Sequence, residues 1–210
     1  MKILYFDLFL GVSSKSIFSA LCDILPNHTL NAKCEKQDVS GILCTNAHLY
    51  DENFFSDDDY LFAKNICENI LKDKEFNQSI FCAINYLLKI ISPDFIISSP
   101  IYDGSGFDAQ KNMCIPSPKV LKMFKDLNIP YECLKIQKQL AKEDGIALIK
   151  SVANDFGTLP KLDIDKIGYG TDSDAITRVV TGYEKQDSLC DIFEMSSELS
   201  DIKEFSYLTK

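Results

Sequence analysis

The chain has 210 residues, 46% of them hydrophobic, and a formal net charge of −9 from 31 acidic and 22 basic side chains. These values are typical of a globular protein with one main domain, and they argue against disorder and against a fibrous repeat. Because the negative charge would repel a phosphate backbone and the lysines are spread out, we expect no nucleic acid partner.

No apolar stretch approaches the roughly 18 to 20 residues that a membrane span needs, and no cleavage-site pattern follows the first ten residues. We therefore expect a cytoplasmic protein without a membrane partner. The eight cysteines contain no C-x-x-C pair, which removes the usual zinc and thioredoxin signals. We expect buried free thiols, and the apolar contexts of Cys44, Cys82 and Cys114 favour the core.

The first half of the chain alternates apolar runs of strand length with amphipathic runs of helix length. Gly11 and two serines end the first apolar run, Pro26 stops the helix that follows, and Ser40-Gly41 marks a turn. The expected elements are a strand at 2–9, a helix at 17–25, two modest strands within 30–50, and helices at 60–71 and 80–91.

The second half continues the same alternation and then becomes strand-like. The expected elements are a strand at 95–97, a helix at 119–127, a strand at 131–136, a helix at 144–156, and strands at 167–170, 176–183 and 189–196. Gly157 stands where a left-handed helix C-cap would fall. The pattern predicts an α/β fold, a single domain with a mixed β-sheet flanked by helices, over residues 1–182. Residues 183–210 are expected to be a strand and tail of that domain.

A glycine-bearing loop over residues 98–107 follows the strand at 95–97, and such loops are frequent ligand sites in α/β proteins.

Four segments of the sequence resemble one family in their order and spacing. They are the strand and loop PDFIISSPIYDGSGF, the prolines of CIPSPKVLKMF, the helix start GIALIK and the later IGYG. That family is the pyridinium-3,5-bisthiocarboxylate mononucleotide nickel insertion proteins. The opening MKILYFDLFLGVS is similar to the amino terminus of the family as well. The resemblance extends over most of residues 1–182 and is best at 93–170.

The resemblance implies a cytoplasmic enzyme, a nickel-inserting cyclometallase of the lyase class. It would use CTP and nickel to place the metal in a pyridinium dithiocarboxylate nucleotide, giving the nickel-pincer cofactor of lactate racemase and its relatives. The expected ligands are therefore nickel, CTP and a nucleotide-like small molecule. The sequence ends soon after residues 178–182, so we expect a partner chain to supply the family's second domain.

Several positions depart from the family pattern. Asp7 keeps the first carboxylate of the family's opening turn, whereas Lys15 replaces the second and reverses the local charge. Asn112 stands where the family usually has a histidine, and residues 142–144 (Lys-Glu-Asp) replace a Thr-Pro-Thr sequence. The chain also has only two histidines. These changes predict weak nickel binding and reduced or lost catalysis.

The resemblance assigns the site residue by residue. Asp7 and Ser13 are the catalytic candidates, and Asp7 is also the candidate metal ligand. The candidates for cofactor binding are Gly11, Gly104, Ser105, Gly106, Asn112 and Arg178.

Simpler interpretations exist for each candidate. Asp7 could cap the turn at Gly11, the G-S-G sequence could be an ordinary turn, and Arg178 could pair with Asp172 or Asp174. His48 is expected on the surface, and His28 is given no role.

Two functional hypotheses follow from this sequence. In the first, the chain is a nickel insertion enzyme with nucleotide and metal bound around Asp7, Ser13 and residues 104–106. In the second, it is a non-catalytic binding or helper module of the same fold, for a nucleotide-like ligand or a protein partner. Both require Asp7 and the glycine loop to lie near one edge of a sheet.

Overall fold

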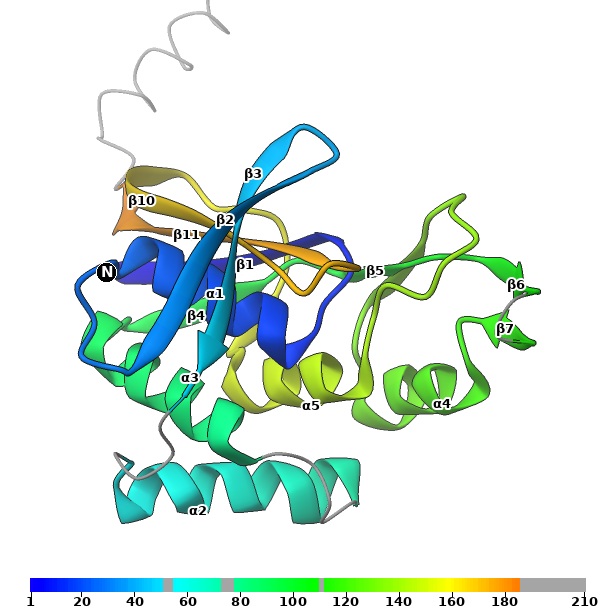
Figure 1. Cartoon of the computed structure of the whole chain (residues 1–210), viewed down its shortest axis with the longest axis horizontal. Coiled ribbons are helices and arrows are strands. Elements are labelled where there is room, and N and C mark those ends of the chain that lie inside the picture. Colours follow the sequence, from blue (N-terminus) through cyan, green and yellow to red (C-terminus); the bar gives the residue numbers. More distant parts are fainter. Residues whose placement is uncertain (51–54, 73–77, 110–111, 186–210) are drawn as a thin grey trace, which may run out of the picture.

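The computed structural model describes residues 1–50, 55–72, 78–109 and 112–185 (Figure 1). In chain order the first elements are β1 (Lys2–Leu10), α1 (Ser14–Ile24), β2 (Ala32–Val39), β3 (Ile42–Leu49), α2 (Asp57–Asn65), the π-helix η1 (Ile66–Leu71), α3 (Gln78–Ile91) and β4 (Phe95–Ser98). They are followed by β5 (Ile101–Asp103), β6 (Gly106–Asp108), β7 (Met113–Ile115), α4 (Pro118–Leu127), β8 (Tyr131–Cys133), α5 (Glu143–Val152), β9 (Asp155–Phe156), β10 (Leu162–Thr171) and β11 (Ile176–Glu184).

The main sheet has seven strands in the order β2-β3-β10-β11-β1-β4-β9. Strand β1 runs parallel to β4 and antiparallel to β11, so the sheet is mixed. Two further pairs, β5 with β8 and β6 with β7, form small sheets of their own. The α/β class and the mixed sheet are therefore confirmed.

Helices α1, α3 and α5 pack on one face of the main sheet, and Figure 1 shows them together below the strands. The apolar side chains of β1 that point to this face are fully buried. The core includes Leu4, Phe6, Leu8, Phe18, Phe81, Leu87, Ile146 and Val179. None of the helices in the described parts of the chain is long and apolar enough to cross a membrane.

Side-chain caps fix the amino termini of α2 and α4. The acidic residues 57–59 form the first turn of α2, where Ser56 and Asp59 make a reciprocal capping box. Ser117 caps α4 and Pro118 occupies its first turn. The expected strand pair within residues 30–50 is also confirmed, with its turn at Ser40-Gly41.

The expected helix at 144–156 is wrong at its carboxyl end. Helix α5 stops at Val152, and Ala153 has an extended backbone instead of a left-handed cap at Gly157. The chain leaves the helix because Asn154 pairs with β4: its side chain accepts from Ile96 N, and its N–H donates to Ile96 O. Residues 155 and 156 then become the edge strand β9.

Three smaller expectations also change. The loop expected at 98–107 contains β5 and the start of β6, and the strand expected at 131–136 is only three residues long. Cys114 is exposed and not part of the core, because it lies on the short β6–β7 pair, whereas Cys44 and Cys82 are buried as expected. The strand expected at 189–196 lies outside the described residues, and the division at residue 182 stays a prediction.

Candidate functional site

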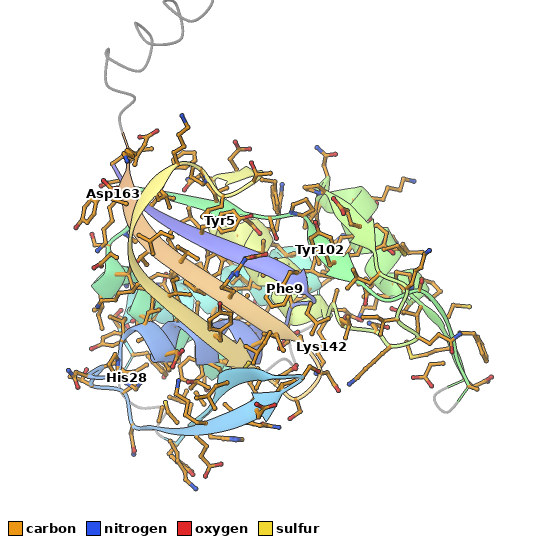
Figure 2. All side chains as sticks on the ribbon, turned by 90° about the horizontal axis from the view of Figure 1, so that it is seen from above. Tyr5, Phe9, His28, Tyr102, Lys142 and Asp163 are labelled. Carbon is orange, nitrogen blue, oxygen red and sulfur yellow. The ribbon has the colours of Figure 1, made fainter. Side chains whose placement is uncertain are left out.

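The face of β1, β11 and β10 opposite α1 is the outer face, and it carries the first group of candidate residues (Figure 2). Cross-strand register places side chains on it in rows, because residues paired between neighbouring strands point to the same side. The rows that form the outer face are Asp7, Arg178 and Tyr169; Tyr5, Val180 and Ile167; and Ile3, Gly182 and Ile164.

An ion pair joins the two charged residues of the outer face. Arg178 donates to Asp7 Oδ2 from Nε at 2.9 Å and also from Nη2, and its guanidinium lies 5.6 Å from the ring centroid of Phe9. Asp7 is 9% exposed as a whole residue, whereas the Arg178 side chain is 40% exposed. The alternative interpretation, in which Arg178 pairs with Asp172 or Asp174, is not what the structure has, because direct cross-strand register brings Arg178 to Asp7. The carboxylate is neutralised, while part of the guanidinium faces solvent.

Aromatic side chains surround this ion pair. Tyr5, Phe9 and Tyr102 lie close together in Figure 2, and the Tyr5 hydroxyl donates to Gly157 O at 3.3 Å. Burial, together with the negative charge of Asp7, raises the pKa of Tyr5 to about 12, so its hydroxyl stays protonated near neutral pH. The outer face thus combines flat aromatic groups with one partly exposed guanidinium.

The second group of candidates lies where the amino termini of α1 and α5 meet. Ser13 is the N-cap of α1: its hydroxyl accepts from Ser16 N at 3.0 Å, and it is almost completely buried. Asp144, in the first turn of α5, accepts from the Ser14 N–H at 3.2 Å and from the Ser14 hydroxyl. The amino terminus of α1, which would attract a bound anion, therefore already holds a carboxylate of the same chain.

An ion pair with a buried carboxylate and a half-exposed lysine borders the same region. Lys142 Nζ contacts Asp172 Oδ2 at 2.7 Å, and the Asp172 side chain is 3% exposed. Burial would raise the pKa of Asp172, but hydrogen bonds from Lys142, Ala175 N and Ser13, with the charge of Lys142, outweigh it and hold this pKa below its ordinary value. Asp172 also accepts from Asp174 N and Ala175 N, so it shapes the turn between β10 and β11.

The glycine loop 104–106 packs on a neighbouring segment and not on Asp7. Ser105 N donates to Ile136 O at 2.8 Å, and its hydroxyl donates to Leu134 O at 2.7 Å. A side chain at Gly104 would meet the carbonyl oxygen of Lys138. The loop follows the carboxyl end of β4, which is parallel to β1, so the expected shared edge is confirmed at the level of the strands.

Asp103, which precedes the glycine loop, was missed by sequence reasoning. Its Oδ1 accepts three backbone N–H groups, from Gly104 at 2.8 Å, Leu140 at 2.6 Å and Ala141 at 3.1 Å. The residue is fully buried, and its Oδ2 has no hydrogen-bond partner among the described residues. Burial, the largest influence, raises the pKa of Asp103. The only signal in the sequence was a carboxylate directly before G-S-G.

The remaining candidates hold turns. Gly11 has φ +82° and lies against Leu140, where a side chain would approach the Leu140 carbonyl to 2.4 Å. Asn112 has φ +50° and lies in the turn between β6 and β7. Figure 1 shows this pair at the far end of the molecule from β10, projecting away from the main sheet. Gly106 begins β6 and Asn112 lies in the turn before β7, so both belong to this separate strand pair and not to the outer face.

Comparison of the sequence with known protein families assigns the chain to one of them. Residues 79–197, more than half of the chain, match the family model described as nickel insertion protein. The chain belongs to the nickel insertion protein family.

Individual relatives agree with this assignment. The chain is 28% identical to the pyridinium-3,5-bisthiocarboxylic acid mononucleotide nickel insertion protein of Acetivibrio thermocellus, over 81% of this chain and 56% of that protein. Proteins of the same name in Lactiplantibacillus plantarum and Geobacillus kaustophilus are 34% and 32% identical over 40% and 43% of this chain. The chain spans about half the length of the Acetivibrio relative. No solved structure matches it.

In this member of the nickel insertion family residues 142–144 all make contacts within the chain. Lys142 pairs with Asp172, Glu143 with Lys119 at 2.5 Å, and Asp144 with Ser14. Charged groups thus link the start of α5 to α1, to α4 and to the turn between β10 and β11.

Proposed function

We propose that this chain serves the insertion of nickel into a pyridinium-3,5-bisthiocarboxylic acid mononucleotide, in the biogenesis of the nickel-pincer cofactor. The family match over residues 79–197 is the observation that carries this proposal. Nickel and the mononucleotide are the substrates in this account, and both come from what the names of the relatives say those proteins act on.

We place the mononucleotide on the outer face, beside Arg178. A pyridinium ring can stack on aromatic side chains such as Phe9 and Tyr102, and a phosphate can accept from a guanidinium. The partly exposed guanidinium of Arg178 is held in place by Asp7 and Phe9, so little side-chain entropy would be lost on binding. The amino terminus of α1 is a weaker candidate for the phosphate, because Asp144 already occupies it.

We also propose that catalysis by this chain is reduced. Both catalytic candidates have structural partners: Asp7 binds Arg178, and Ser13 caps α1. Lys15 supplies a positive charge where the resemblance has a second carboxylate. A divalent cation would have to displace the guanidinium from Asp7, which makes Asp7 a poor metal ligand in this arrangement.

We assign the use of CTP to the part of the family's length that this chain does not span. That part could follow in the same protein or come from a partner chain. The support is the coverage of 56% of the Acetivibrio relative, together with the family resemblance, which associates the second domain with nucleotide handling.

Reconstitution tests this function. The chain, the carboxyl-terminal segment of the Acetivibrio relative, CTP, nickel and the mononucleotide are combined, and the nickel-containing nucleotide is measured by mass spectrometry. We expect product that requires this chain and forms more slowly than with the intact relative. Absence of product, with the same substrate converted by the intact relative, would contradict the enzymatic function.

The second candidate function is a non-catalytic helper module. It is favoured by Ile164 and Ile167, which are 50% and 48% exposed on the outer face and could contact a protein partner. Two results would support this function: the chain binds the mononucleotide without converting it to the nickel-containing product, or the intact family member binds to the outer face. Replacing Ile164 and Ile167 by Ser together should then weaken the protein contact without changing mononucleotide binding.

A further inference from the structure

A cluster of soft metal-ligating side chains lies at the end of α1 opposite to Ser13. Cys22 comes from the last turns of α1, His28 from the turn that follows, and Cys34 from β2. Their ligand atoms all lie within 4.8 Å of one another. The spacing C-x5-H-x5-C matches none of the usual metal-binding motifs. The three residues come together only because the chain turns after α1 and returns as β2.

The cluster has the exposure and the available lone pairs that an ion site needs. Cys22 is buried, His28 is half-buried and Cys34 is exposed, so the group extends from the core to the surface. The Nδ1 atom of His28 is buried and has no hydrogen-bond partner among the described residues. A buried ring nitrogen without a partner is costly unless something binds it.

The nearest carboxylate, Asp23, is already committed to the fold. It accepts from Thr45 Oγ1 at 2.6 Å and from Tyr169 N at 3.0 Å, and it pairs with Lys36. These bonds tie α1 to β2, β3 and β10. Asp23 therefore adds negative charge beside the two thiols without itself being free to act as a ligand.

We propose that Cys22, His28 and Cys34 bind one thiophilic divalent metal ion, of the class of Ni²⁺ and Zn²⁺, with its fourth position open. Two thiolates and an imidazole suit these ions and not Mg²⁺ or Ca²⁺, which prefer oxygen. Ligand atoms around a tetrahedral ion of this class are about 3.5 Å apart, so donors within 4.8 Å need to move by about 1 Å. Three protein ligands with an open position are typical of sites that react or exchange.

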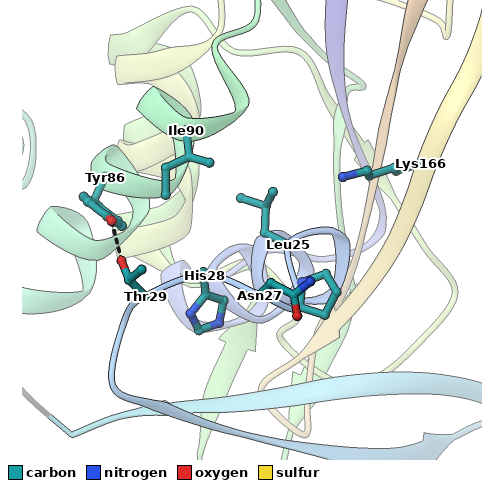
Figure 3. Close-up of a pocket in the computed structure, with 8 residues that line it drawn as sticks. Leu25, Asn27, His28, Thr29, Tyr86, Ile90 and Lys166 are labelled. Carbon is teal, nitrogen blue, oxygen red and sulfur yellow. Dashed lines mark hydrogen bonds between the residues drawn. The ribbon is translucent and has the colours of Figure 1, made fainter.

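A pocket of about 400 Å³ adjoins the cluster at His28, which is one of its lining residues (Figure 3). Its wall combines the turn after α1 with Tyr86 and Ile90 of α3 and Lys166 of β10. Thr29 and Tyr86, which both line the pocket, share a hydrogen bond of 2.6 Å.

This inference rests on residues outside the outer face and goes beyond the proposed function. Tight nickel binding at this cluster would contradict the expectation of weak nickel binding, which considered carboxylates and histidines separately from the cysteines. If the ion is nickel, the chain carries its own substrate metal; if it is zinc, the ion fixes the α1–β2 junction. The two are distinguished by comparing their affinities.

The test uses the full chain, reduced and freed of metal, in separate calorimetric titrations with Ni²⁺ and Zn²⁺. Near-ultraviolet absorption is recorded with Ni²⁺, since thiolate ligation gives a sulfur-to-metal charge-transfer band. We expect one ion per chain and this band. Cys34→Ser and His28→Gln should each weaken binding by at least about 100-fold.

Matched controls come from the same chain. Cys133→Ser removes another exposed thiol, and His48→Gln removes the other histidine; both should bind metal as the natural chain does. Thermal melts without metal check that each variant is folded. The proposal is overturned if no stoichiometric binding occurs, if Cys34→Ser and His28→Gln bind as tightly as the controls, or if Cys22 and Cys34 prove to form a disulfide in the freshly isolated chain.

Discussion

Asp7 is the residue whose role is most open to a direct test, because it has both a catalytic and a structural interpretation. It is nearly buried and accepts two hydrogen bonds from Arg178, whereas Lys15 lies in the first turn of α1. We predict that Asp7→Asn lowers the free energy of unfolding by about 1–2 kcal/mol, at the lower end for charge-assisted bonds because Arg178 is 40% exposed. Urea denaturation measures this value.

Lys15→Ala is the matched control for the charge of this region. Removing a cation near a helix amino terminus is neutral or slightly stabilising, so we predict a change within about 0.5 kcal/mol. Equal and negligible changes in both variants would mean that the Asp7–Arg178 pair contributes nothing to stability and that Asp7 is free for another role.

Residue roles were only partly accessible from the sequence. The position of Asp7 in an apolar run indicated a buried carboxylate that needs a partner, and the structure supplies Arg178. The identity of the partner could not be predicted, because it depends on the register between strands separated by about 170 positions. The role of Asp103 was hidden for the same reason, because two of the N–H groups that donate to its carboxylate lie 37 and 38 positions away.

At the scale of elements, the contact between α1 and α5 is the most sensitive point of the fold. A side chain at Gly145 would approach the Ser13 Cα to 2.6 Å and the Val12 carbonyl carbon to 2.8 Å, and both are backbone atoms that cannot rotate away. We predict that Gly145→Ala destabilises the protein by about 1–3 kcal/mol, as overpacking does. Differential scanning calorimetry measures the loss.

Gly157→Ala is the control for the removal of a glycine. Nothing lies within 4 Å of a side chain built there, and its φ is not in the left-handed region. We predict a neutral or slightly stabilising effect, by up to about 1 kcal/mol, through the unfolded state. The account of the α1–α5 contact is wrong if Gly145→Ala melts at the same temperature as Gly157→Ala.

Elements with strong periodicity were predicted closely, and those defined by long-range pairing were not. Strand β1 and helices α1, α3 and α4 differ from their expected bounds by a few residues at most, because local apolar spacing and caps set them. The predicted helix at 144–156 extends beyond α5 because Asn154, which is not a recognisable helix stop signal in the sequence, binds the backbone of β4 at Ile96. Strands β5, β6 and β9 are two or three residues long and leave no periodic trace.

For the whole molecule, buried carboxylates with lowered pKa predict a loss of stability in acid. Asp172 and Asp59 both bind fewer protons in the folded state than in the unfolded state, since their hydrogen bonds and lysine partners outweigh burial. Their contribution is fully present above the unfolded value of about 3.9 and is lost as pH falls through the folded pKa. We predict that the urea midpoint falls progressively below about pH 5.

The Asp172→Asn variant separates the contribution of the Asp172 charge to stability from that of the other groups that titrate in acid. The variant should be less stable than the natural chain at pH 7, and the difference should shrink as pH falls toward 3. A difference that stays constant from pH 7 to pH 3 would show that Asp172 acts only through its turn geometry and not through its charge.

The central claim is that the chain takes the pyridinium-3,5-bisthiocarboxylic acid mononucleotide on the outer face beside Arg178. Equilibrium dialysis of the mononucleotide against the full chain and its Arg178→Ala variant, with bound ligand quantified by mass spectrometry, tests it most directly. We predict one mononucleotide per chain and, for Arg178→Ala, an affinity lower by about tenfold or more, as the loss of a charge-assisted phosphate contact implies. No binding by the natural chain, or equal binding by a folded Arg178→Ala variant, would contradict the claim.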